Sequence, residues 1–381
     1  MKIAILTQPL HTNYGGNLQN FALQKTLRDM GHKPITIDRH ASIKPKAKLI
    51  STLKLGYFKR LVLHYLKGSD KPLWKSYSSG KKEQDYIRQD ITTFIDTYIN
   101  KTPRLYSDDA VHAVFKQNKF DAVIVGSDQC WRPKYSPNIY TYYLDFLKDN
   151  KDIKKLAYAA SFGTGDWEYT EEQTARCKEL IKQFDLVTVR EKAAVNLVTE
   201  KLNKDAEFVL DPTLLLSKED YIELFVGKNL PDNKGIYTYI LDDSDWKTQV
   251  VETSKETLGL PQFSNQHDES NKNSQKIPSI ESWIKGFADA DFVITDSFHG
   301  TVFSIIFNKP FISLVNVSRG ASRFESILSE FGFLHRLIDK FEHKKITGLL
   351  EHNVDKEVIN SKLEELKSKS LDLLNNSISK S

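Results

Sequence analysis

Polar and small residues that could take part in chemistry follow directly after one apolar run near residue 295. Phe292–Thr295 is apolar and β-branched, as a buried parallel strand would be. Next come Asp296, Ser297, His299 and Gly300. A histidine can exchange protons near neutral pH, and the start of a following helix can bind an anion. The stretch predicts either an acid–base and binding site, or a capped turn with His299 packed on the surface.

A second candidate loop lies near the N-terminus, between a predicted strand over Lys2–Leu6 and a predicted helix over 18–30. It carries Gly15, Gly16 and Asn17 just before the helix. Adjacent glycines in this position can bring backbone N–H groups to an anion, or they can simply make a tight turn. The loop lacks the G-x-G-x-x-G pattern, so the fingerprint of dinucleotide-binding proteins is absent.

A third candidate loop follows a predicted strand over 121–125. Its residues are Ser127, Asp128, Gln129, Cys130 and Trp131. Small and polar residues after a parallel strand indicate the edge at which α/β proteins bind ligands. Cys130 has no basic neighbour in the sequence, which favours a small buried residue over a nucleophile. Trp131 either stacks on a sugar or covers the sheet.

Arg190 and Glu191 stand at the end of another predicted strand, 186–189. The planar guanidinium of an arginine matches the geometry of a carboxylate or a phosphate. Arg190 is therefore predicted either to bind an anionic substrate or to form an ion pair with Glu191 or another neighbour.

Short apolar runs alternate with segments of helical spacing along the chain, and this alternation predicts an α/β protein. Strands are predicted at 2–6, 34–37, 121–125, 155–160, 186–189, 208–210, 236–240, 292–295 and 310–315. Helices are predicted at 18–30, 83–100, 108–117, 171–184, 218–226, 246–258, 279–288, 301–307 and in a segment ending at 331, and residues 261–279 are predicted as a loop. A chain of 381 residues is too long for one ordinary core. We predict Rossmann-like domains over 1–212 and 213–342, followed by a helical tail over 343–381.

A basic segment, residues 39–82, interrupts the alternation and belongs to a largely helical insertion over 39–118. It contains twelve lysines and arginines but only one acid, Asp70. A basic amphipathic helix of this kind can lie on an anionic membrane surface or receive a phosphate-bearing partner. The alternative is a solvated covering helix whose lysines confer solubility.

The overall composition is that of a soluble globular protein, with 40% hydrophobic and 27% charged residues and a net charge of +4. This charge does not indicate a nucleic-acid partner. Two cysteines provide neither a disulfide framework nor zinc-ligand spacing, and the cluster at 267–269 has no second ligand set, so no metal site is predicted. The chain has no signal-peptide pattern and no apolar run of about 20 residues, which predicts a cytoplasmic protein.

Five short motifs follow one another along residues 1–335. They occupy 13–23, 126–131, 189–191, 211–213 and 297–300. In order and spacing, this set resembles the polysaccharide pyruvyl transferase family. The resemblance implies a fold similar to the GT-B glycosyltransferases, in which two Rossmann-like domains face each other across a cleft.

The resemblance also implies a reaction. A pyruvyl group would move from phosphoenolpyruvate to two hydroxyls of one sugar in a surface or lipid-linked polysaccharide, giving a cyclic ketal and phosphate without a metal or other cofactor. An acid must protonate the enol carbon and a base must deprotonate the sugar hydroxyls, and His299 can serve in either role. The basic segment is compatible with a membrane-bound, pyrophosphate-linked acceptor.

The donor carries two anionic groups, and Arg190 matches the strand-end arginine of the family. Well-studied members carry Arg-Leu-His where this chain has Ser297, Phe298 and His299. We hypothesise that Arg319 or Arg323, after the next strand, supplies the missing charge.

Two other functions compete with pyruvyl transfer. A GT-B glycosyltransferase with a nucleotide-sugar donor would use the same cleft, although the second half of the chain shows no clear acidic motif for a nucleotide ribose. A non-enzymatic scaffold that docks lipid-linked saccharides through 39–82 would not need His299.

Overall fold

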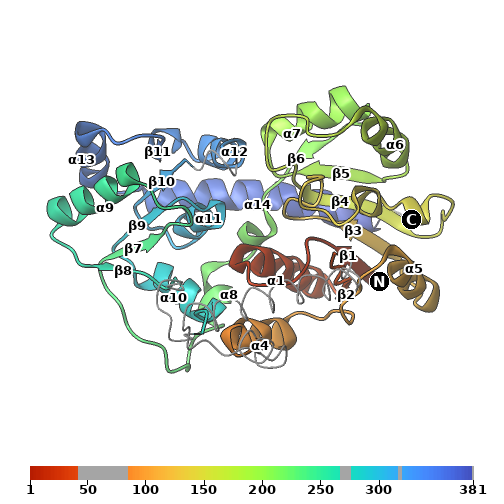
Figure 1. Cartoon of the computed structure of the whole chain (residues 1–381), viewed down its shortest axis with the longest axis horizontal. Coiled ribbons are helices and arrows are strands. Elements are labelled where there is room, and N and C mark those ends of the chain that lie inside the picture. The colour runs from red at the N-terminus through yellow and green to blue at the C-terminus, as the bar shows by residue number, and fades with distance from the viewer. Residues whose placement is uncertain (42–84, 267–275, 316–319, 380–381) are drawn as a thin grey trace, which may run out of the picture.

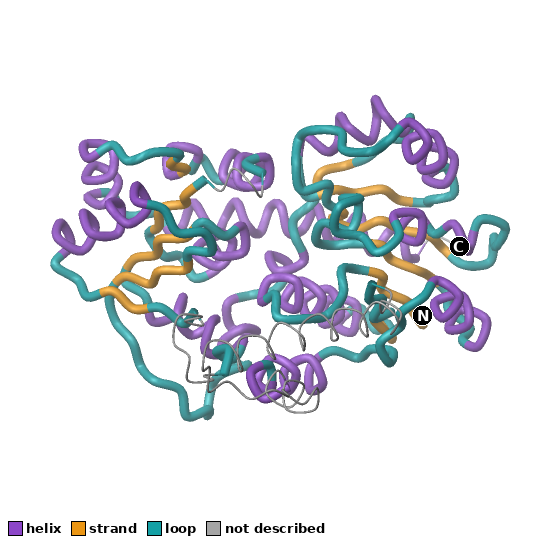
Figure 2. The backbone as a smooth tube through the Cα atoms, in the orientation of Figure 1, coloured by secondary structure: helices purple, strands orange, loops and turns teal. Residues whose placement is uncertain are grey.

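Two separate parallel sheets form the framework of the protein (Figure 1). The computed structural model describes residues 1–41, 85–266, 276–315 and 320–379. Figure 2 shows the strands gathered into two groups, one for each sheet. Most of the basic segment 39–82 lies outside the described residues, so its contact with a membrane stays a prediction.

The first sheet has six strands in the order β2-β1-β3-β4-β5-β6, all parallel. The strands are β1 (Lys2–Leu6), β2 (Lys33–Thr36), β3 (Ala122–Val125), β4 (Lys154–Ala160), β5 (Leu186–Val189) and β6 (Glu207–Phe208). Every residue of β3 is fully buried, as expected for a central strand covered by helices on both faces. The order of strands reverses between β1 and β3, because β2 lies on one side of β1 and β3 on the other.

The second sheet has five parallel strands in the order β11-β10-β9-β7-β8. They are β7 (Ile236–Tyr239), β8 (Gln262–Phe263), β9 (Phe292–Thr295), β10 (Phe311–Leu314) and β11 (Leu337–Ile338). The order reverses here between β7 and β9. The sequence did not predict β8 or β11: residues 261–279 were expected to form a loop, and each of these edge strands has only two residues.

Helices connect the strands of each sheet and pack against them (Figure 1). Those of the first domain are α1 (Tyr14–Asp29), α4 (Gln89–Tyr98), α5 (Asp108–Gln117), α6 (Glu171–Ile181) and α7 (Lys192–Leu197). Those that follow are α8 (Lys218–Ile222), α9 (Asp245–Leu258), α10 (Ile280–Asp289), α11 (Phe298–Ile306), α12 (Ser322–Glu330), α13 (His343–Glu351) and α14 (Lys356–Ser379).

Helix α11 begins at Phe298, three residues before the predicted start at 301. The side chain of Ser297 accepts a hydrogen bond from the backbone N–H of Gly300, which caps the helix at this earlier point. His299 consequently lies in the first helical turn and not in a loop, so its direction is set by the helix.

The C-terminal helix α14 contacts both domains. Near its start, Asn360 accepts a hydrogen bond from Asn308, just after α11. Farther along, Ser370 accepts one from the backbone of Leu210, and the carbonyl of Ile378 accepts one from Lys154 on β4. The helical tail predicted from the sequence therefore connects the two domains.

Candidate active site

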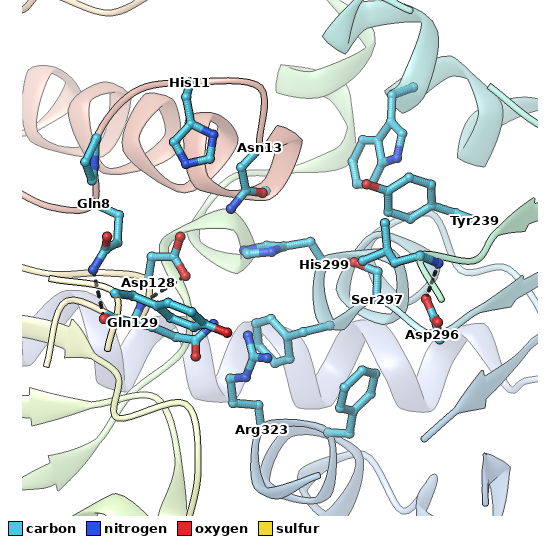
Figure 3. A pocket seen from close by; sticks show the side chains of 17 residues that line it. Gln8, His11, Asn13, Asp128, Gln129, Tyr239, Asp296, Ser297, His299 and Arg323 are labelled. Atoms are coloured by element: carbon cyan, nitrogen blue, oxygen red, sulfur yellow. Dashed lines mark hydrogen bonds between the residues drawn. The ribbon is translucent and has the colours of Figure 1, made fainter. Parts of the chain in front are cut away.

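A cavity of about 350 Å³ lies between the two domains (Figure 3). Both domains contribute residues to its wall. The lining residues are Gln8, Pro9, His11, Asn13, Gly15, Asp128, Gln129, Tyr135, Tyr239, Leu241, Trp283, Asp296, Ser297, Phe298, His299, Arg323 and Phe324.

The topology of the two sheets explains why the cavity lies here. In open α/β sheets, ligands bind outside the carboxyl ends of strands at the point where the strand order reverses. Residues 8–13 and 128–129 follow β1 and β3, between which the first sheet reverses. Leu241 and residues 296–297 follow β7 and β9, between which the second sheet reverses. The cavity therefore joins the expected binding edges of both sheets.

The first turns of three helices also line the cavity. Gly15 belongs to α1, residues 298–299 to α11, and residues 323–324 to α12. A helix N-terminus carries a partial positive charge and backbone N–H groups that can bind an anion. Asn13 and Ser297 cap α1 and α11 by accepting one N–H group each. The part of the wall formed by these helix N-termini thus favours a negatively charged group of a ligand.

His299 extends from α11 toward the part of the cavity formed by Asn13 and Asp128 (Figure 3). Its side chain is only 9% exposed, although it lines the cavity. Gly15 lies against the ring, because a Cβ atom at that position would be 2.0 Å from Nδ1. The other ring nitrogen, Nε2, lies 3.8 Å from Oδ2 of Asp211 and has no hydrogen-bond partner among the described residues. The imidazole is thus held between the two domains with unused hydrogen-bonding capacity.

Arg190 does not line this cavity and forms ion pairs with neighbouring carboxylates, which was the alternative interpretation of this residue; its contact with a substrate stays a prediction. The guanidinium is buried and donates a 2.6 Å hydrogen bond to Asp211 and a 3.2 Å hydrogen bond to Asp128. Burial would raise the pKa of Asp211, but His299 and Arg190 hold that pKa well below its usual range. Arg190 therefore stabilises two carboxylates beside the cavity.

Arg323, in contrast, lines the cavity from the first turn of α12. This position is the one required if Arg323 supplies the positive charge that is missing beside His299. Its guanidinium carbon lies 5.5 Å from the centre of the Phe298 ring. Burial and the neighbouring charge of Arg190 lower the pKa of Arg323 to about 10, so the side chain stays charged at neutral pH. Arg319 lies outside the described residues, and its role stays a prediction.

Four other residues predicted to bind a ligand do not line the cavity but contact residues that do, or residues next to them. The N–H of Gly16 donates to Asn13, and the amide of Asn17 donates to the carbonyl of His11. The hydroxyl of Ser127 donates to Asp211 over 3.1 Å. Gly300 packs on Thr295, because a Cβ atom there would be 2.2 Å from the threonine hydroxyl.

Several lining residues were not predicted. His11 and Gln8 lie on the polar loop after β1, and their position after a central strand was the available signal. Tyr239 and Trp283 form part of the wall on the second domain. Trp283 lies inside α10 and is fully buried, so its sequence context is that of an ordinary core residue.

Cys130 and Trp131 are packing residues. Both side chains are fully buried, and burial raises the pKa of the Cys130 thiol to about 12. The indole of Trp131 stacks on Tyr143 at 5.0 Å and donates a hydrogen bond to the carbonyl of Tyr142. The interpretation of Cys130 as a small buried residue fits this environment, and Trp131 covers the sheet.

Replacement of Cys130 by alanine is expected to leave turnover within about twofold and to cost about 1 kcal/mol of stability, because a buried packing group is lost. Thermal unfolding and steady-state kinetics on the same preparation measure the two quantities. A tenfold loss of turnover in a folded variant would show that the thiol takes part in the reaction.

The described residues contain no group of three or more histidine, cysteine, aspartate or glutamate side chains that could hold a metal ion. The cluster at 267–269 lies outside this part of the chain. In the same described ranges, no helix has the length and apolar character needed to cross a membrane.

Residues 13–318 match the family model described as polysaccharide pyruvyl transferase, whereas no curated protein matches the chain. Among solved structures, UDP-GlcNAc 2-epimerase from Neisseria meningitidis is similar over 99% of both chains, with 11% identity and a TM-score of 0.54. The S. aureus MnaA–UDP structure is similar over 96% of this chain and 91% of that one, with 13% identity and a TM-score of 0.51. UGT89C1 from Arabidopsis thaliana, complexed with UDP-L-rhamnose, is similar over 99% and 98%, with 10% identity and a TM-score of 0.51. These likenesses confirm the predicted GT-B arrangement of two Rossmann-like domains.

Proposed function

Because the chain belongs to the polysaccharide pyruvyl transferase family, we propose that it moves the pyruvyl group of phosphoenolpyruvate onto two hydroxyls of one saccharide unit. The observation that supports this most is the position of His299. Its imidazole lines a cavity between the two domains and lies in the first turn of a helix, and Arg323 lines the same cavity. Transfer from phosphoenolpyruvate requires a group that exchanges protons and a wall that binds the phosphate and the carboxylate of the donor.

The proposed reaction requires one proton addition to carbon and the loss of one proton from each of two sugar hydroxyls. A proton is added to the methylene carbon of phosphoenolpyruvate, which becomes the methyl group of the ketal. One sugar hydroxyl bonds to the neighbouring carbon and loses its proton, and the C–O bond to phosphate breaks. The second hydroxyl closes the ring and loses its proton, which leaves with the phosphate. An imidazole can donate and accept protons in turn, so His299 can serve both steps.

The negative charge of the donor must also be held. Arg323 and the N-termini of α11 and α12 lie on the second domain's wall of the cavity, which also carries His299. The first domain contributes Gln8, Asn13 and Gln129, whose amides can hydrogen-bond to sugar hydroxyls. We therefore assign the donor to the wall that carries Arg323 and the saccharide acceptor to the wall formed by the loops after β1 and β3.

Replacement of Arg323 by glutamine is expected to raise the KM for phosphoenolpyruvate by about 10–100-fold, because hydrogen bonds to a charged group contribute about 1.5–3 kcal/mol. Initial rates at varied donor concentration measure this change. Arg176→Gln is the matched control, since it removes the same charge from a half-exposed pair with Asp145. An unchanged KM for Arg323→Gln would remove this residue from the donor site.

The function itself is tested by incubating the full chain with phosphoenolpyruvate and a panel of saccharides, including lipid-pyrophosphate-linked ones. Release of phosphate together with a new ketal methyl signal in the NMR spectrum is the expected result. Thermal stabilisation by UDP-sugars, without stabilisation by phosphoenolpyruvate, would favour the nucleotide-sugar glycosyltransferase instead.

A further inference from the structure

We propose that Asp211 is the positioning residue of His299, and that it holds the imidazole in the tautomer with the proton on Nε2. The other ring nitrogen, Nδ1, then carries no proton and can act as the proton acceptor. It lies beside Gly15, and both Gly15 and His299 line the cavity. The kinetic part of this inference rests on the proposed function, whereas the tautomer does not.

The geometry around Nε2 supports this assignment. Nε2 is buried without a hydrogen-bond partner among the described residues, and the carboxylate oxygen Oδ2 of Asp211 lies 3.8 Å away. A buried N–H group without a partner costs about 1–3 kcal/mol. A shift of about 1 Å brings the two atoms within hydrogen-bond distance. His299 belongs to α11 of the second domain, whereas Asp211 follows β6 of the first sheet, so small movements between the domains change this distance.

Asp211 is held in place by four donors and does not line the cavity. Oδ2 accepts hydrogen bonds from Arg190 and from the hydroxyl of Ser127, and Oδ1 accepts two from the backbone and hydroxyl of Thr213. Pro212 follows directly and starts a short helical turn, which fixes the backbone. A carboxylate bound in this way stays charged, so it can orient an imidazole but does not itself exchange protons with a substrate.

This arrangement also gives Arg190 a function that does not require contact with a ligand. Its guanidinium compensates the buried charges of Asp211 and Asp128, both of which lie within 3.2 Å of it. A buried carboxylate without such a partner would become protonated. Arg190 therefore maintains the negative charge that Asp211 needs in order to orient His299.

The tautomer can be measured directly on the full chain labelled with 15N-histidine. Long-range proton–nitrogen NMR spectra distinguish the two tautomers, and the signal missing from His299→Gln assigns this ring. We expect the Nε2-protonated form in the wild type and loss of this preference in Asp211→Asn. Thr213→Val is the matched control, because it removes one donor to the same carboxylate but keeps its charge. A wild-type ring protonated on Nδ1 would overturn the inference, even if Asp211→Asn did not fold.

Kinetics then separate positioning from folding. A positioning residue acts on the transition state, so Asp211→Asn is expected to lower kcat by about 10²–10⁴-fold with the KM for phosphoenolpyruvate within about threefold. An unchanged kcat in the folded variant would contradict the inference while leaving pyruvyl transfer intact. The expected tautomer in a protein that never releases phosphate would support the inference and reject the proposed function.

Discussion

Replacement of His299 by glutamine is expected to lower kcat for pyruvyl transfer by about 10²–10⁴-fold, which is the usual contribution of a general acid–base residue. The imidazole lines the cavity, and glutamine fills similar space without exchanging protons. Initial rates of phosphate release measure the loss. Thermal unfolding should change little, because glutamine fills similar space and its amide N–H can also donate to Asp211, which lies beside Nε2 in the wild type.

His352→Gln is the matched control for this experiment. His352 is exposed at the end of α13, where its ring hydrogen-bonds to the carbonyl of Gly348. It should keep full activity. A loss below tenfold in His299→Gln would count against His299 as the proton-transfer group and would favour the scaffold, which does not need this residue.

The sequence predicted strands wherever an apolar run was long enough to show its pattern. The runs 186–189 and 292–295 became β5 and β9 with the same bounds. The edge strands β8 and β11 have only two residues each, so they show no periodicity that could be recognised. The start of α11 was placed too late because residues 296–300 were interpreted as the turn between the strand and the helix, whereas Ser297 caps a helix that already begins at Phe298.

The sequence also predicted some residues of the site correctly and missed others. His299 was found because the ends of parallel strands are where such folds bind ligands. Arg190 stands at an equivalent strand end, but its partners Asp211 and Asp128 are 21 and 62 residues away in the chain. A strand-end position therefore predicts that a residue lies near the cavity. It does not predict whether carboxylates from distant parts of the chain will form ion pairs with its side chain. Tyr239 and Trp283 were missed because aromatic residues in a core and in a cavity wall have the same sequence context.

The second large prediction concerns the first turn of α1, because Gly15 packs against the imidazole of His299 and so fixes its position. Replacement of Gly15 by alanine is expected to lower kcat by about 10²-fold, since displacing a reacting group by about 1 Å can cost that much. The added Cβ would lie 2.0 Å from Nδ1 and 2.3 Å from Cγ of His299, so the ring must move. Steady-state kinetics together with the unfolding temperature measure the effect.

Gly348→Ala is the matched control for that substitution. Gly348 also lies in a helix, α13, and no described atom beyond its own helix and chain neighbours lies within 4 Å of the position of its Cβ. Alanine there should stabilise the helix by up to about 1 kcal/mol without changing turnover.

The double variant Gly15→Ala/His299→Gln tests whether the alanine at position 15 acts by displacing the imidazole. If the alanine acts only by displacing the imidazole, the double variant will be no slower than His299→Gln alone, because interacting residues are not additive. A further loss in the double variant would mean that Gly15 also contacts the substrate, since the ring that it displaces is already absent.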